Sequence, residues 1–418
     1  MIDMLIPGNI LLPERQNFEK WSVIACDQFT SQPDYWEAVD KIVGSERSTL
    51  RLMLPEVYLN QPDAELRSRR ILNNMKQYLA DGVFRLLPNC YIYVERTLSS
   101  GGTRRGILGL LDLEAYDYRS DASSPVHATE GLVIERIPPR LALRREAYLE
   151  SPHLVLFYDD AENSVNRLVA SLEKEPLYDF PLMCGGGRIR GSSVSGKEAE
   201  MLRAGLNRLS DPELLRKKYG SCESPVVFAV GDGNHSLATA RKYWEELKPT
   251  LSPEEQITHP ARYTLAELVN LHEPDVEFEP IHRVLFDTDA SAFLREAAEY
   301  FAPVGAEAHI LRCISAEGEV PLSVGGTIGQ SIAACEKFVE DYSARHGGRI
   351  DYIHGLNNTR EMAVLPGRAA LLMPEMRKSE LFPSIIYSGI LPKKSFSIGP
   401  ALDKRYYLEC RCIKPDAL

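Results

Sequence analysis

One short segment of the sequence combines the residue types that acid–base and phosphate chemistry require. Residues 231–236 follow an apolar stretch, 225–230, and open a segment with helical periodicity. A strand-to-helix turn of this kind presents backbone N–H groups and the positive end of a helix, which attract anions. The segment consists of Gly231, Asp232, Gly233, Asn234, His235 and Ser236.

The side chains of this turn suggest distinct roles. Asp232 could coordinate Mg²⁺ or orient a hydroxyl group, and His235 titrates near neutral pH, as a general acid or base requires. We therefore interpret both as candidate catalytic residues, and Asp232 also as a candidate Mg²⁺ ligand. In the alternative interpretation Asp232 only caps the helix and His235 is a structural histidine. The candidate cofactor-binding residues of the turn are Gly231, Gly233, Asn234 and Ser236.

Two familiar nucleotide-binding signatures are incomplete. Ser236 stands where the fingerprint G-x-G-x-x-G needs its last glycine, so we expect no nicotinamide cofactor. Residues 191–198 nearly match the phosphate-binding loop, but Glu198 replaces the hydroxyl that holds Mg²⁺, and residues 185–190 lack a strand pattern. These residues could instead form a flexible basic loop over an anionic ligand. That loop would use Arg188, Arg190 and Lys197.

Metal and disulfide patterns are weak. His127 and Glu130 could share a helix face, but no third ligand stands at a suitable spacing, so we expect no structural zinc. The eight cysteines form no C-x-x-C pair, which favours reduced thiols.

Charge and hydropathy limit the partners. The net charge of -11, from 48 Lys and Arg against 59 Asp and Glu, makes nucleic acid an unfavourable partner. Asp3 and Pro7 interrupt the first apolar residues, so a secretory signal is not expected, and no apolar run is long enough to span a bilayer. We expect a cytoplasmic protein with a small-molecule ligand, and a homo-oligomer is compatible with the sequence.

The pattern of the chain alternates between strands and helices. Strands are expected over 21–26, 153–158, 225–230, 263–271, 369–373 and 406–410, and a hairpin over 91–94 and 107–111. Helices are expected from Pro33 and over 64–79, 162–173, 197–219, 235–247, 291–300 and 331–346. The fold class is therefore α/β, of the mixed α+β kind. A glycine-rich stretch places the expected domain boundary between an N-terminal region 1–184 and a C-terminal region 185–418, which carries the turn.

Four segments resemble one bacterial family in the same order. Residues 231–240 resemble the A-D-G-H-H-R-like motif of the family catalogued as domain of unknown function 1015. Residues 23–36 look like the opening of a bacterial branch of that family. Residues 280–284 look like its P-x-H-R-V element, and residues 391–396 like its closing P-x-K-S segment. The resemblance covers nearly the whole chain.

The resemblance also implies a fold and a ligand. The family's D-G-H-H-R element is similar to that of the ParB and sulfiredoxin superfamily, which includes partition proteins that bind CTP and free-serine kinases that use ADP or ATP. It implies a ParB/sulfiredoxin-like core with additional strands and helices, and nucleotide phosphate at the turn. Asp232, Gly233 and His235 match the motif, whereas Asn234 and Ser236 replace its first histidine and its arginine.

The missing arginine must be replaced if phosphate binds at the turn, because arginine grips phosphate bidentately. The residues that could compensate are Arg241, Arg283, Lys393 and Lys394; Glu130, Arg140 and His282 are further candidates from the matched elements.

These observations favour a nucleotide-dependent phosphotransferase that uses ATP or ADP with Mg²⁺ and acts on a small metabolite such as a hydroxy amino acid. The alternative is a regulatory protein that binds a nucleotide or metabolite without turnover. A third hypothesis is hydrolysis or another metal-assisted reaction at the same turn. An active site requires Asp232, His235 and at least one arginine or lysine to converge on one cleft.

Overall fold

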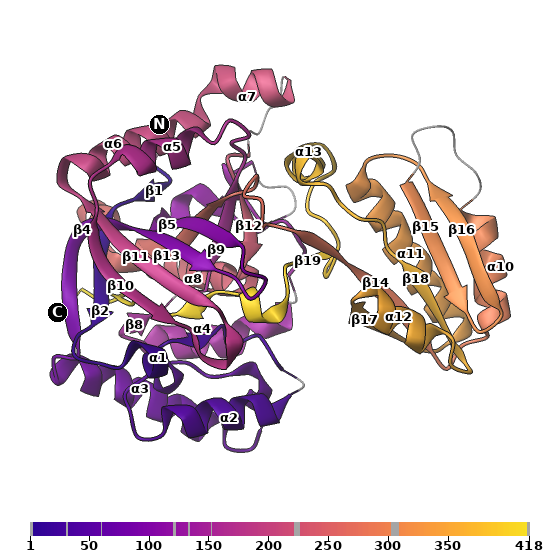
Figure 1. Cartoon of the computed structure of the whole chain (residues 1–418), viewed down its shortest axis with the longest axis horizontal. Helices are drawn as coiled ribbons and strands as arrows, with labels where there is room; N and C mark the ends of the chain where they lie inside the picture. The colour runs from indigo at the N-terminus through magenta and orange to yellow at the C-terminus, as the bar shows by residue number, and fades with distance from the viewer. Residues whose placement is uncertain are drawn as a thin grey trace. The chain divides into compact units, whose positions relative to one another are not determined.

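The computed structural model describes residues 3–30, 32–59, 61–119, 123–132, 134–151, 153–220, 226–301 and 309–415. The chain divides into two compact units. Unit 1 comprises Met1–His127, Val133–Val276 and Pro400–Leu418, and unit 2 comprises Ala128–Leu132 and Glu277–Gly399. Each unit combines helices with a sheet (Figure 1), which confirms the mixed α/β class.

The expected boundary between residues 184 and 185 falls within unit 1. Strands β10 (Glu175–Pro181) and β11 (Arg188–Ser195) pair antiparallel across it. Gly185 and Gly187 both have φ of +78°, and a Cβ on Gly187 would lie 2.0 Å from the carbonyl oxygen of Thr97. The glycines are therefore required by a tight connection between paired strands, and not by a linker between domains.

The described part of unit 1 contains an eleven-stranded sheet. Along its main path the strands run β10-β11-β4-β5-β13-β9-β12-β7-β6, with β1 on β5 and β2 on β4. The remaining bounds are β4 (Phe84–Thr97), β5 (Thr103–Asp112), β13 (Tyr263–Asn270), β9 (Val155–Tyr158), β12 (Phe228–Asp232), β7 (Val126–His127), β6 (Tyr116–Asp117), β1 (Leu5–Ile6) and β2 (Gly8–Pro13). The antiparallel pairing of β4 with β5 confirms the expected hairpin.

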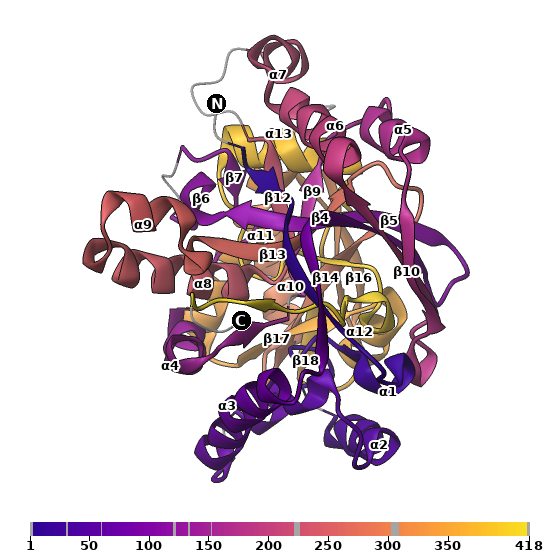
Figure 2. The same ribbon diagram turned by 90° about the vertical axis from the view of Figure 1, so that its left-hand side faces the viewer.

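Helices cover this sheet on two sides. Figures 1 and 2 show α5 (Ser164–Ser171) and α6 (Gly196–Asn207) on the side of unit 1 opposite α2 (Pro33–Val43) and α3 (Ala64–Ala80). The expected single helix over 197–219 is wrong, because α6 ends before Asp211, whose side chain caps a second helix, α7 (Pro212–Tyr219).

The near match to the phosphate-binding loop lies in a strand. Residues 191–195 belong to strand β11, which pairs with both β10 and β4, so they cannot form a loop around phosphate. Nor is the stretch a flexible basic loop, since the Arg188 side chain donates to Asp179 at 2.7 Å on the neighbouring strand.

A small sheet joins the two ends of the chain. Strand β3 (Val23–Ile24) pairs with β20 (Tyr406–Tyr407), and the indole N–H of Trp21 donates to the carbonyl of Leu408 at 2.9 Å. Trp21, Val23 and Ile24 are fully buried in the main apolar core of unit 1. This pairing fixes the residues that follow β3 beside those of β20.

Unit 2 has its own sheet in the order β16-β15-β18-β14-β17, with β19 on β14. Its strands are β14 (Phe278–Phe286), β15 (His309–Ser315), β16 (Gly318–Val324), β17 (Arg349–His354), β18 (Arg368–Leu372) and β19 (Phe396–Ile398). Its helices include α10 (Ala290–Tyr300), α11 (Ile328–His346), α12 (Leu356–Ala363) and α13 (Lys378–Ser388). The expected strand at 369–373 and helices at 291–300 and 331–346 are confirmed.

Within the described ranges, none of the helices has the length and apolar character that crossing a membrane demands.

Candidate active site at the turn before helix α8

The turn at residues 231–236 has the expected architecture. Strand β12 ends at Asp232, and helix α8 (Asn234–Leu247) begins two residues later. Gly233 between them has φ of +79°, and a Cβ there would lie 3.0 Å from the Cα of Leu154. A Cβ on Gly231 would lie 2.6 Å from the ring of Phe157. Both glycines are thus needed for the close approach of the turn to strand β9.

Asp232 is paired with a lysine from the C-terminal segment. Its carboxylate lies 3.5 Å from Nζ of Lys404 and accepts a hydrogen bond from the N–H of Gly233 at 2.8 Å. The loop that carries Lys404 is held by the buried Arg96, which donates to the carbonyls of Lys404 and Leu402 at 3.0 and 2.9 Å. The side chain of Lys404 is 12% exposed, so a cation is fixed in a largely buried position at this turn.

His153 lies at the centre of the site, although its role was not predicted. It precedes strand β9 and is 6% exposed. Its Nδ1 lies 2.7 Å from the hydroxyl of Tyr407, and its Nε2 lies 3.4 Å from Oγ of Ser236 and 3.8 Å from the carboxylate of Asp27. The structure therefore brings together four segments that are far apart in the sequence.

The hydrogen bonds of Tyr407 orient the imidazole. The Tyr407 hydroxyl donates to the sulfur of Cys26 at 3.1 Å. Because a phenol has one proton, Tyr407 then accepts at its oxygen from Nδ1–H of His153. With the proton on Nδ1, the acceptor lone pair of the imidazole is the one on Nε2, which faces Ser236. Burial raises the pKa of Tyr407 far above its usual value, and burial with the charge of Asp27 raises the pKa of Cys26 to about 12, so neither group ionises at neutral pH.

The charges at the site favour an ionised Asp27 and a neutral His235. Burial works to raise the pKa of Asp27, but the charge of His153, a hydrogen bond from Gln28 and the charge of Lys404 hold that pKa below its usual value. Burial, followed by the charges of Arg140 and Arg136, lowers the pKa of His235 to about 4. His235 is therefore uncharged at neutral pH.

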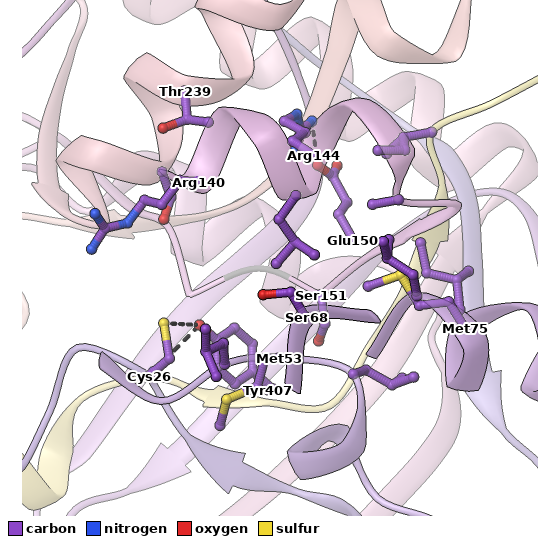
Figure 3. A pocket seen from close by; sticks show the side chains of 18 of the residues that line it. Cys26, Met53, Ser68, Met75, Arg140, Arg144, Glu150, Ser151, Thr239 and Tyr407 are labelled. Carbon is purple, nitrogen blue, oxygen red and sulfur yellow. Dashed lines mark hydrogen bonds and ion pairs between the residues drawn. The ribbon is translucent and has the colours of Figure 1, made fainter. Parts of the chain in front are cut away.

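A cavity of about 660 Å³ opens beside these groups. Figure 3 shows Cys26 and Tyr407 at one end of its wall and the ion pair of Arg144 with Glu150 at another. His153 and Ser236 also belong to the wall, whereas Asp232 and His235 do not. Most of the wall is apolar, including Leu52, Met53, Leu54, Leu72, Met75, Leu143, Leu149, Leu237 and Leu265.

Arg140 is the one predicted basic residue in this wall. Its guanidinium forms an ion pair with Glu56 and also donates to the carbonyl of Arg136 at 2.6 Å. Arg241, a proposed substitute for the missing arginine, instead binds Glu245 and the carbonyl of Leu113. Asn234 accepts a hydrogen bond from the hydroxyl of Tyr116 at 3.4 Å, so its amide helps to hold the start of helix α8.

The other predicted residues belong to unit 2. Glu130, His282, Arg283, Lys393 and Lys394 all lie there, and unit 1 contains the turn. His127 is the last residue of β7, so the helix face expected for His127 and Glu130 does not exist. Over the described ranges, no group of three or more His, Cys, Asp or Glu side chains is placed to hold a metal ion.

The residues that the sequence analysis missed had only weak local signals. Asp27 lies three residues after the short buried strand β3, in the segment 23–36 that carries the family resemblance. His153 precedes a strand and Lys404 follows β19, without any motif. The pairing of β3 with β20 brings Asp27 close to Lys404, and His153 is placed by strand β9, which pairs with β12.

Taken together, the fold and the site define a mixed α/β protein with a histidine, a serine and a buried lysine around the start of one helix. The model of the family described as "Protein of unknown function (DUF1015)" matches residues 7–379, and the chain belongs to this family. No curated protein matches the chain.

Solved structures give only remote similarities. A conserved hypothetical protein from Pyrococcus furiosus is 9% identical, with a TM-score of 0.35, over 73% of this chain and 95% of that one. A mutant free serine kinase in complex with AMP is 10% identical, with a TM-score of 0.39, over 72% and 90%. Similarity at this level is too remote to transfer a function, and the relation to ParB and sulfiredoxin proteins stays a prediction.

Proposed function

We propose that unit 1 is a phosphotransferase that moves a phosphoryl group from a nucleotide to the hydroxyl group of a small metabolite, such as a hydroxy amino acid. One observation carries the proposal. The free lone pair of His153 faces the Ser236 hydroxyl and the Asp27 carboxylate at the start of helix α8. A base that can accept a proton from a hydroxyl group therefore lies beside a helix N-terminus that attracts phosphate.

His153 is the proposed general base. In the reaction, the acceptor hydroxyl gives its proton to Nε2 of His153 as its oxygen bonds to the terminal phosphorus, and the bond from that phosphorus to the leaving nucleotide oxygen breaks. The hydrogen bond to Tyr407 holds the ring, and the negative charge of Asp27 stabilises the imidazolium that forms. Ser236 occupies the position at which an acceptor hydroxyl would meet Nε2.

The phosphate charge would be neutralised by three groups. The backbone N–H groups of the first turn of helix α8 give this end of the helix a partial positive charge, and Lys404 places a buried cation at the same turn. Arg140 can exchange its ion pair with Glu56 for a phosphate oxygen in the cavity. These groups would replace the arginine that the motif lacks at Ser236.

Mg²⁺ would enter with the nucleotide as part of the substrate. This ion commonly uses one or two protein carboxylates together with phosphate oxygens. Asp232 and Asp27 are the carboxylates near Lys404, so they are the residues that would contribute. The role of Asp232 as a metal ligand, and of His235 as a catalytic residue, stays a prediction.

A second function is favoured by the same contact. If Ser236 itself is activated by His153, its Oγ could act as a nucleophile in hydrolysis or group transfer through a covalent intermediate. Replacing Ser236 by alanine separates the two functions, because a direct phosphotransferase keeps most of its activity and a serine nucleophile loses it. A protein that only binds its ligand would show no turnover, either as the wild type or with Ser236 replaced by alanine.

Ligand binding can be tested by thermal unfolding with ATP, ADP, CTP and GTP, each with and without Mg²⁺. A ligand that binds the folded chain raises its unfolding temperature. We expect a shift with one nucleotide that Lys404→Ala reduces and His346→Gln does not, since His346 is an exposed residue of unit 2. Absence of a shift with every nucleotide would contradict the phosphotransferase.

A further inference from the structure

Unit 2 contains a loop whose backbone binds a carboxylate. Residues 392–396 follow helix α13 and lead into strand β19, and the N–H groups of Lys394, Ser395 and Phe396 all donate to Glu130. The donor–acceptor distances are 3.1, 2.9 and 3.2 Å. Lys394 has φ of +56°, and successive N–H groups around a left-handed residue form a concave anion-binding surface.

The loop is held in this shape by its own contacts. Ser395 is 1% exposed, and its hydroxyl donates to the carbonyl of Pro392 at 2.6 Å. Phe396 starts strand β19, which pairs with β14. The three donors are therefore fixed before any ligand arrives, which lowers the entropic cost of binding.

A fully buried arginine lies against the same loop. Arg283 donates from Nη1 to the carbonyl of Lys394 at 3.0 Å and from Nε to Glu336 at 2.8 Å. Its Nη2 is buried and has no hydrogen-bond partner among the described residues. A buried donor without a partner is costly, so this nitrogen has unused capacity for an anion.

The nearby acidic side chains already have cationic or hydrogen-bonding partners. Glu336 receives hydrogen bonds from Arg283 and from the hydroxyl of Tyr352 at 2.6 Å, and Glu340 lies 3.8 Å from Nζ of Lys393. Nζ of Lys394 lies 4.8 Å from the ring centre of Tyr352. The surroundings of the loop thus carry three basic residues and leave the Glu130 carboxylate as the anion that the loop holds.

We propose that this loop is a phosphate-binding site of unit 2 and that Glu130 occupies it as an internal competitor. A phosphate group, free or carried by a small metabolite, would replace the carboxylate on the three N–H groups and reach Arg283 or Lys394. Burial raises the pKa of Glu130 to about 6 even though the three N–H groups and Arg283 lower it, so the carboxylate gains solvation when it leaves. The proposal does not depend on the function proposed for unit 1.

Calorimetric titration of the full chain with inorganic phosphate and, separately, with AMP tests this site. An internal competitor lowers the apparent affinity in proportion to the fraction of time for which the site is vacant. We therefore expect Glu130→Ala to bind phosphate or AMP about tenfold more tightly or better than the wild type. Glu361→Ala removes the same charge from an exposed position in α12 and should bind like the wild type. Binding of free phosphate and of AMP distinguishes the two sources of the phosphate group.

Two results would overturn the proposal. One is a folded Glu130→Ala chain that binds neither ligand more tightly than Glu361→Ala does. The other applies to the wild type alone, so it does not depend on the stability of a variant. Crystals soaked in selenate should show anomalous selenium density at the N–H groups of 394–396, with the Glu130 side chain displaced. Absence of this density, with Glu130 still hydrogen-bonded to the N–H groups, would contradict the site.

Discussion

Nε2 of His153 lies 3.4 Å from Oγ of Ser236, and the opposite ring nitrogen lies 2.7 Å from the hydroxyl of Tyr407. This relationship places an oriented imidazole between a buried phenol and the first turn of helix α8. The ring can accept a proton only on the side that faces the cavity and Asp27. The proposed chemistry of unit 1 rests on this arrangement.

Lys404 should contribute to binding and not to proton transfer. Lys404→Ala removes the cation beside Asp232 and Asp27, so we expect nucleotide affinity to fall about tenfold, as for the loss of one charged hydrogen bond. The maximal rate should change less than the affinity. Isothermal titration of the wild type, Lys404→Ala and Lys404→Arg measures the effect, and affinity that is equal in all three would remove Lys404 from the site.

Gly233 should tolerate no side chain. Gly233→Ala combines a φ of +79° with a Cβ 3.0 Å from the backbone of Leu154, and we expect a loss of about 1–3 kcal/mol of stability together with loss of ligand binding. Gly82→Ala is the matched control, because Gly82 has φ of +61° but no atom within 4 Å of the added Cβ. Chemical denaturation compares the two, and equal costs would show that the approach to Leu154 is unimportant.

The turn was predictable from the sequence, but the site around it was not. An apolar run followed by glycines and a helical pattern specifies β12 and α8 locally, and the structure confirms both. Asp27, His153 and Tyr407 come from three separate segments. The pairing of β3 with β20 joins the first to the third, and strand β9 of the main sheet places His153. Local spacing carries no information about such a contact.

The domain boundary was also predicted at the wrong place, because local sequence was used to infer a long-range arrangement. The glycines near residue 185 were interpreted as a linker, although they serve a hairpin. The real division is discontinuous, since Pro400–Leu418 returns to unit 1 and Ala128–Leu132 belongs to unit 2. Arg283, Lys393 and Lys394, which were expected to compensate for the arginine missing at Ser236, belong to unit 2, and that role stays a prediction.

A buried charge network in unit 1 should be essential for stability. Arg405 binds the carboxylates of Glu267 and Glu409, and all three side chains are 2% exposed or less. Arg405→Met leaves two buried carboxylates without their cation, so we expect a loss of about 3–5 kcal/mol in the free energy of unfolding. Arg349→Met, which breaks an exposed pair with Asp351, should cost about 0–1 kcal/mol. Urea denaturation that gives equal losses would contradict the assignment.

Unit 2 should lose stability on mild acidification through His282. Burial, followed by the charges of Arg283 and His354, lowers the pKa of His282 from 6.5 to about 4, and its Nδ1 accepts from the N–H of Met373 at 3.1 Å. The unfolded chain therefore binds this proton first, so stability falls as pH decreases from 6.5 towards 4. Glu130, whose pKa is raised to about 6, contributes with the opposite sign in that range.

The contribution of His282 can be isolated by substitution. His282→Gln keeps an acceptor for Met373 but cannot titrate, so the loss of stability between neutral and mildly acidic pH should be smaller in the variant than in the wild type. Denaturation curves of the two chains at several pH values measure this difference. Parallel pH profiles would show that His282 is not protonated on unfolding.

The most direct test of the central claim is the phosphorylation of a hydroxyl acceptor, beginning with serine, by the wild type and by His153→Gln with a labelled nucleotide and Mg²⁺. We expect phosphorylated product from the wild type and a rate about 10²–10⁴-fold lower from His153→Gln, as for the loss of a general base, with nucleotide binding retained. His346→Gln should react like the wild type. Product formation that is unchanged in His153→Gln, or absent from the wild type with every acceptor and nucleotide, would contradict the proposed phosphotransferase.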